Sequence, residues 1–162
     1  MAGEIFAGGF QHAARLGIAA GDEESGADLE LGYRTEPLSR RIIFGPRVYG
    51  LLSKNLNGDT NFASAGLLWR KNFTSRLYGQ LGFGLAVHDG AVDLADAGTP
   101  RDRIAFGTRV LFQSELSLGW SLSRRWAVEA SYVHISNGGI KANVNPGMDD
   151  VGARVVYRFG GR

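Results

Sequence analysis

Alternation of apolar and polar residues is the feature of this sequence that most constrains its fold. Each alternating run extends over roughly ten residues and ends at turn residues, whereas helical periodicity is nearly absent. A period of two places successive side chains on opposite faces of a β-strand. Eight strands are therefore predicted, and they span Gly3–His12, Ala27–Thr35, Pro46–Lys54, Asn61–Lys71, Leu77–His88, Thr108–Leu122, Trp126–Asn137 and Asp149–Phe159.

The connections between these predicted strands alternate between long and short. The long ones contain AARLGIAAGDEESG, NLNGDT, DGAVDLADAGTPRDRIAFG and GGIKANVNPGM, and the short ones lie near EPLSRR, NFTSR and SRR. This alternation is typical of an up-and-down barrel with its long loops at one end. Because no linker or change of composition divides the chain, residues 1–162 are predicted to form one all-β domain, an eight-stranded antiparallel up-and-down β-barrel.

The two faces of the predicted strands differ in chemistry. One face is continuously apolar, and in the sixth and eighth strands it carries Val110, Phe112, Leu116, Val151, Val155 and Tyr157. The other face is small or charged. Its charged residues are predicted to form ion pairs that fill a small barrel, and they include Glu30, Glu115, Glu129, Arg34, Arg154 and Arg158.

Two kinds of barrel produce this pattern. A transmembrane barrel turns its apolar face to lipid, and a soluble barrel of the lipocalin type turns it to a ligand in the lumen. Strands of about ten residues match a tilted crossing of the membrane. Aromatic residues also lie near turns or the C-terminus, as interfacial girdles do, and these are Trp69, Trp120, Trp126, Tyr157 and Phe159. We therefore favour a transmembrane barrel in the outer membrane of a Gram-negative bacterium.

Composition excludes several other classes of protein. The sequence has no cysteine, which excludes disulfides, zinc–thiolate sites and cysteine nucleophiles. A net charge of +2, with scattered basic residues, argues against a nucleic-acid partner. No metal or cofactor is predicted, and two further histidines at strand ends, His12 and His88, are predicted to be interfacial.

An unusual set of polar residues lies on the apolar face near the C-terminus. His134 and Ser136 share that face with Tyr132, and continuing the parity of the last strand places Asp149 on it while Asp150 points inward. The last two strands form a hairpin, so His134 and Asp149 are expected near the same, long-loop end. A β-bulge would exchange the faces of Asp149 and Asp150.

These three residue types suit nucleophilic catalysis. A serine hydroxyl is a weak nucleophile until a base takes its proton, and histidine has a suitable resting pKa. A carboxylate on the second ring nitrogen would fix the tautomer. Residues i and i+2 of a strand lie roughly 6.5–7 Å apart at Cα, a gap that leaning side chains can close. Oxyanion donors could come from Asn137, Asn145 and the backbone at Gly138–Gly139.

The C-terminal segments HISNGG, NPGMD and YRF resemble the lipid A 3-O-deacylase family of the PagL type. The resemblance is strongest over the last thirty or so residues, and the strand TRVLFQSELSLGWSL is also similar. It implies an eight-stranded outer-membrane barrel that hydrolyses the ester of the 3-hydroxyacyl chain at the 3-position of lipid A. It further implies His134 as base, Ser136 as nucleophile and Asp149 as the acid, where a known member has glutamate. Asn145 falls at the position of an oxyanion asparagine, and Asn137 follows the serine as in the family.

Lipid A of lipopolysaccharide is accordingly the predicted partner and substrate, and a homodimer is possible. Two other functions remain open. One is a non-enzymatic small barrel that serves structure or adhesion through its long loops. The other is a soluble barrel that holds an apolar ligand beside an inward-facing His134.

Overall fold

The computed structural model describes residues 2–15, 17, 19, 23–39, 41–98, 102–140 and 146–160. The eight predicted strands are confirmed, with ends that shift by one or two residues. Their bounds are β1 Gly3–Gln11, β2 Ala27–Thr35, β3 Arg47–Asn55, β4 Phe62–Asn72, β5 Leu77–His88, β6 Val110–Ser121, β7 Trp126–Ser136 and β8 Met148–Phe159. No helix long and apolar enough to cross a membrane occurs within these described ranges.

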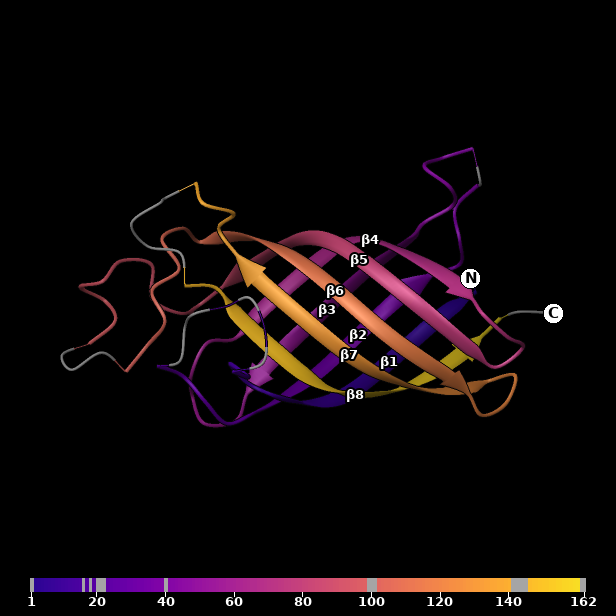
Figure 1. Cartoon of the computed structure of the whole chain (residues 1–162), viewed down its shortest axis with the longest axis horizontal. Coiled ribbons are helices and arrows are strands. Elements are labelled where there is room, and N and C mark those ends of the chain that lie inside the picture. The colour runs from indigo at the N-terminus through magenta and orange to yellow at the C-terminus, as the bar shows by residue number, and fades with distance from the viewer. Residues whose placement is uncertain are drawn as a thin grey trace.

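The eight strands close into an antiparallel barrel in chain order (Figure 1). Closure comes from β1 and β8, which pair in a continuous register from Gly3 opposite Phe159 to Gln11 opposite Val151. Because the sheet has no free edge, the backbone groups of every strand find partners within the sheet, as a hydrocarbon environment requires.

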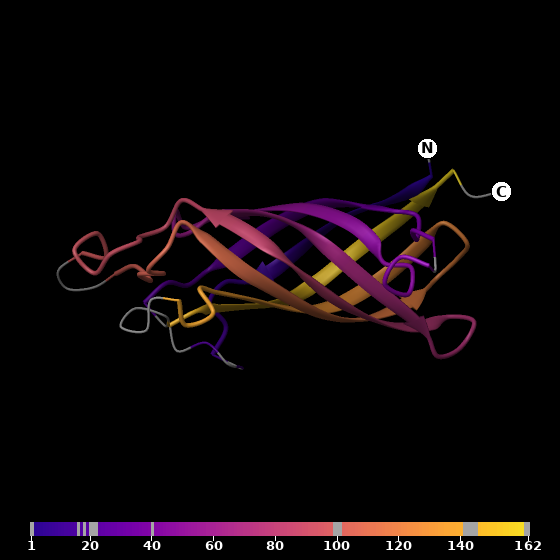
Figure 2. The same ribbon diagram turned by 90° about the horizontal axis from the view of Figure 1, so that it is seen from above.

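Both termini lie at the end of the barrel that carries the short turns (Figures 1 and 2). These turns are residues 73–76 and 122–125, and the longest loop, residues 89–109, lies at the opposite end. One expectation was wrong. The connection between β2 and β3, grouped above with the short turns, covers residues 36–46 and exceeds the β3–β4 loop of residues 56–61.

The outer face of the barrel is apolar, as the parity predicts. Large hydrophobic side chains that are about half exposed cover it, among them Leu31, Leu52, Phe83, Phe112, Leu116, Leu118 and Val155. The interior is the polar face, so the apolar surface is available to lipid. This arrangement opposes that of a soluble barrel with an apolar lumen.

Arginine–glutamate pairs fill the interior. Arg34 binds both carboxylate oxygens of Glu129, at 2.8 and 2.9 Å. Arg154 donates to Glu30 at 2.8 Å and to Glu115 at 2.6 Å. All five side chains are at least 98% buried. The predicted interior ion pairs are therefore confirmed, and they leave each buried charge with a partner of opposite sign.

Replacing Arg154 with alanine should destabilise the barrel strongly. The change leaves Glu30 and Glu115 buried without the cation that they bind. Removing one partner of a buried ion pair typically costs about 3–5 kcal/mol. Urea unfolding in lipid vesicles, followed by tryptophan fluorescence, measures the effect. Arg76→Ala, in the exposed β4–β5 turn, is the control. An Arg154→Ala barrel as stable as this control would contradict the prediction.

Candidate active site

The hairpin of β7 and β8 brings an imidazole and a carboxylate together. His134 and Asp149 are direct register partners in the two strands. The Nδ1 atom of His134 lies 2.7 Å from Oδ1 of Asp149. The aspartate side chain is short, yet direct pairing across the strands lets it reach the ring.

The second ring nitrogen of His134 faces the serine. Nε2 lies 3.0 Å from Oγ of Ser136, so both nitrogens are in hydrogen bonds. With the proton on Nδ1 donated to Asp149, Nε2 accepts the hydrogen bond of the Ser136 hydroxyl. This tautomer leaves a lone pair aimed at the hydroxyl proton, which is the arrangement that a general base needs.

The two adjacent aspartates lie on opposite faces of β8. Asp150 points into the barrel, where its Oδ1 accepts the backbone N–H of Ala13 at 3.0 Å. Asp149 lies on the outer face with His134 and Ser136. No bulge exchanges the two residues, so Asp149 is the carboxylate that contacts His134.

Asp149 is nevertheless fully buried, which sequence parity did not anticipate. The loop that follows β1 covers it: Ala19 N–H donates to its Oδ2 at 3.0 Å, and Ala14 N–H donates to its backbone carbonyl at 2.6 Å. Gly17 lies so close to Asp149 and Tyr132 that a side chain there would collide with both. The acid is thus shielded by loop backbone, while 15% of the His134 side chain is accessible.

A buried ion cluster fixes the start of this loop. His12 lies between two carboxylates, with Nδ1 2.8 Å from Asp28 and Nε2 2.9 Å from Glu24. At 1% exposure, His12 is not the interfacial residue that its position at a strand end indicated. The several acidic residues of the β1–β2 loop were the only sequence signal for a buried ion pair with His12. The conformation of the loop decides which of them reaches the imidazole.

Glu24 connects three loops at this end of the barrel. Its carboxylate accepts hydrogen bonds from the N–H and hydroxyl of Thr60 in the β3–β4 loop and from the N–H of Ile104 in the β5–β6 loop. Together with His12, these contacts bind the three loops to one buried side chain. The loop over Asp149 is therefore held by contacts well away from His134 and Ser136.

The surroundings of the cluster shift the pKa values of both His12 and Glu24. Burial alone would lower the pKa of His12, but the hydrogen bonds and charges of Asp28, Glu24 and Asp150 raise it to about 10. Burial alone would raise the pKa of Glu24, but hydrogen bonds from His12, Thr60 and Ile104 hold it below its usual value. His12 is consequently a buried cation at neutral pH.

The same cluster contains residue types that can bind a metal ion. Within the described residues, one group of potential ligands has donor atoms within 4.8 Å of one another, namely His12, Asp28 and Asp150. Both ring nitrogens of His12 are already in hydrogen bonds with carboxylates, Nδ1 with Asp28 and Nε2 with Glu24. We therefore assign this group to loop anchoring.

Two of the predicted oxyanion donors, the Asn137 amide and the Gly139 N–H, are already engaged in hydrogen bonds. The amide of Asn137 donates to the Phe106 carbonyl at 2.9 Å, and its Oδ1 accepts the Gly139 N–H at 2.8 Å. Asn137 is 1% exposed and joins the β7–β8 loop to the β5–β6 loop. Asn145 lies outside the described residues.

Gly147 was not identified from the sequence, although it lies against the site. A Cβ there would be 3.1 Å from Cε1 of His134 and 3.4 Å from Cβ of Ser136. Its φ of +66° is also a conformation that favours glycine. Gly147 therefore has a spatial reason, because a glycine lets the loop backbone approach the imidazole so closely.

The contribution of His12 to stability should depend on pH. Its folded pKa of about 10 exceeds the ordinary 6.5, so the stabilisation is complete below pH 6.5 and disappears as the pH rises through about 10. We expect His12→Gln to lower the melting temperature at pH 6 by at least about 2–4 °C, the shift for 1 kcal/mol in a chain of this size. Circular dichroism in detergent at pH 6, 8 and 10.5 measures it. A difference between the two proteins that stays constant up to pH 10.5 would be incompatible with a charged His12.

Solved structures with the same fold belong to outer-membrane and surface proteins. The outer membrane enzyme PagL superposes with a TM-score of 0.66 at 13% identity, covering 94% of this chain and 97% of that one. Neisserial surface protein A gives 0.58 at 14% identity, with 98% and 96% covered. The Yersinia pestis outer membrane protein Ail gives 0.54 at 13% identity, with 98% and 100% covered. At these identities the likeness establishes the fold, which is that of small outer-membrane barrels, as expected.

A comparison of sequences identifies the family. Curated protein sequences contain no match to the chain. The lipid A 3-O-deacylase (PagL) family profile, in contrast, matches residues 41–158. The match covers most of the chain and includes His134, Ser136 and Asp149. The chain therefore belongs to the lipid A 3-O-deacylase (PagL) family.

Proposed function

We propose that this protein hydrolyses the ester bond of the acyl chain at the 3-position of lipid A, with Ser136 as nucleophile. Family membership supports a lipid A deacylase. The observation that carries the finer assignment is the hydrogen-bonded series Asp149–His134–Ser136 on the outer surface of the barrel, at 2.7 and 3.0 Å. A structural or adhesive barrel has no need for such a series.

The proposed reaction has two steps. Ser136 Oγ attacks the ester carbonyl while Nε2 of His134 takes the hydroxyl proton, and Asp149 stabilises the resulting imidazolium. His134 then gives that proton to the leaving sugar oxygen, which leaves an acyl group on Ser136. In the second step His134 deprotonates a water molecule, and the water releases the fatty acid and restores the serine. The scheme requires no metal or cofactor.

The location of the series determines how substrate arrives. Ser136 and His134 face outward near the long-loop end, which lies outside the cell in bacterial outer-membrane barrels. Lipid A in the outer leaflet could reach them sideways through the membrane. The barrel lumen is not needed as a route, because buried ion pairs fill it.

Stabilisation of the oxyanion requires donors near Ser136. The β7–β8 loop supplies the candidates, namely the backbone at Gly138–Gly139 together with Asn137 and Asn145. Because the Asn137 amide donates to Phe106 in the β5–β6 loop and the Gly139 N–H donates to Asn137, each would have to exchange a partner to serve. The positive φ values of Gly138 and Gly139, 64° and 82°, show where the loop backbone depends on glycine.

The possible homodimer stays a prediction.

Replacing Ser136 or His134 with alanine should abolish deacylation while the barrel remains folded. Loss of either group removes the nucleophile or its base, and we expect a fall in rate of at least about 1,000-fold. Mass spectrometry of lipid A, before and after incubation with the purified protein, measures the loss of one hydroxyacyl chain. The matched control is Ser114→Ala, because Ser114 lies opposite His134 in the neighbouring strand.

Each outcome of that experiment separates the competing functions. Wild-type and Ser114→Ala proteins that deacylate lipid A, together with inactive Ser136→Ala protein, support the proposal. Folded wild-type protein that leaves lipid A unchanged would favour the non-enzymatic barrel. Activity retained in Ser136→Ala would refute the assignment of the nucleophile.

The two neighbouring aspartates offer an isosteric comparison. Asp149→Asn keeps the shape but removes the charge that fixes the His134 tautomer, and we expect a fall in kcat of about 100- to 10,000-fold. Asp150→Asn should keep most of the activity, since an amide oxygen can still accept the Ala13 N–H. Single-turnover deacylation with both variants measures the difference. Equal losses would indicate that the carboxylate beside His134 has no special role.

A further inference from the structure

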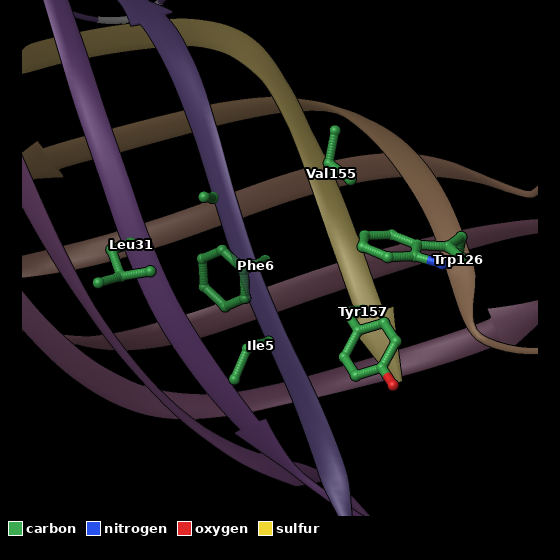
Figure 3. Close-up of a pocket in the computed structure, with 7 residues that line it drawn as sticks. Ile5, Phe6, Leu31, Trp126, Val155 and Tyr157 are labelled. Carbon is green, nitrogen blue, oxygen red and sulfur yellow. The ribbon is translucent and has the colours of Figure 1, made fainter. Parts of the chain in front are cut away.

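A hollow of about 420 Å³ lies on the outer surface, and Figure 3 shows the residues that line it. Strands β1, β2, β7 and β8 form it, and its lining is almost wholly apolar. The lining residues are Ile5, Phe6, Ala7, Leu31, Trp126, Val155 and Tyr157. Along β7, Trp126 is the first residue and Ser136 the last, so the hollow and the triad occupy opposite ends of the same outer face.

The register of the strands explains the hollow. Ala7 pairs with Leu31 on one side and with Val155 on the other. A methyl group therefore lies between two larger side chains that are themselves half exposed, at 60% and 50%. The result is a depression with apolar walls, which suits an unbranched hydrocarbon chain better than a rigid ligand.

Aromatic residues close the hollow towards the short turns. The rings of Trp126 and Tyr157 lie with their centroids 4.8 Å apart. In Figure 3 both rings are at the edge of the hollow, with Leu31 on the far side. Tryptophan and tyrosine favour the boundary between hydrocarbon and lipid headgroups, so this edge marks the depth at which a headgroup begins.

Basic residues lie immediately beyond that edge. Arg124 and Arg125 are exposed in the β6–β7 turn, directly before Trp126. Within the described part of the chain neither is in an ion pair. Tyr157 also lines a second hollow of about 530 Å³, whose charged residues are five arginines and two glutamates, namely Arg47, Arg70, Arg124, Arg125, Arg158, Glu4 and Glu36. Arg70 and Arg158 both bind Glu4, whereas the two turn arginines have no carboxylate partner among the described residues, so the hollow carries an excess of positive charge that includes the turn.

We propose that this surface binds an anionic glycerophospholipid of the inner leaflet. The phosphate would be held by Arg124 and Arg125, and one acyl chain would pass Trp126 and Tyr157 into the depression beside Ala7. Arginine suits phosphate because its guanidinium group can donate two parallel hydrogen bonds. Short turns face the periplasm in barrels of this kind, so the leaflet that this end meets is composed of phospholipid. The proposal does not depend on the enzymatic activity.

Native mass spectrometry of the detergent-solubilised full chain tests the proposal, with phosphatidylglycerol and phosphatidylcholine of equal chain length as probes. We expect phosphatidylglycerol to bind more tightly. The double variant Arg124→Gln/Arg125→Gln should weaken phosphatidylglycerol binding by at least about tenfold, because each basic residue near an anionic lipid adds to the attraction. Arg41→Gln, an exposed arginine in the β2–β3 loop at the same end, is the control and should bind like wild type.

A second variant tests the acyl part of the site. Ala7→Leu fills the depression on the outer face, and it should weaken both phospholipids about equally while circular dichroism shows an intact barrel. Equal affinity of the wild type for the two lipids, or unchanged binding by the double arginine variant, would overturn the proposal. Unchanged binding by Ala7→Leu would overturn the acyl site. Competition by purified lipid A at equal concentration would also count against an inner-leaflet phospholipid.

Discussion

The contact between β1 and β8 is the interaction on which the rest of the structure depends. It joins the first and last strands in an unbroken register and removes the free edges of the sheet. In hydrocarbon an unpaired backbone N–H or C=O costs several kcal/mol. A β-sheet is therefore stable there only when it closes into a barrel. Once the sheet is closed, the alternation of each strand decides which side chains meet lipid and which fill the lumen.

Strand β7 shows what this separation achieves. Its inward residues include Glu129, which belongs to the ion-pair interior, and its outward residues include His134 and Ser136. Packing of the barrel and the proposed chemistry therefore use alternate residues of the same strand. A fully packed interior is compatible with a reactive outer surface, because neither needs space that the other occupies.

Much of this architecture could be predicted from the sequence, because strand parity and hairpin register are local properties. Parity placed His134, Ser136 and Asp149 on one face, and the hairpin brought His134 and Asp149 together across the strands. The approach of Gly147 to the imidazole was not predicted, since turn residues are common in loops of every kind. The length of the β2–β3 connection was also misjudged, because EPLSRR alone resembles a short turn.

The covering of Asp149 and the burial of His12 could not be predicted for a different reason. Each depends on where a long loop folds, and the contact from Ala19 to Asp149 joins residues that are 130 positions apart. A histidine at a strand end is compatible with an interface or with a buried ion cluster. The choice is made by Glu24 and Asp28, which no periodic pattern directs towards it.

The single carboxylate that joins three outer loops has a consequence for how this end of the molecule tolerates change. Thr60, Ile104 and His12 are far apart in the sequence but share hydrogen bonds to Glu24, so a change in one of their loops can act on the other two through this side chain. A substitution in a loop remote from Ser136 can thereby alter how firmly the acid is shielded. The loops at this end therefore depend on one another through Glu24, whereas residues 73–76 and 122–125 form two separate turns at the other end.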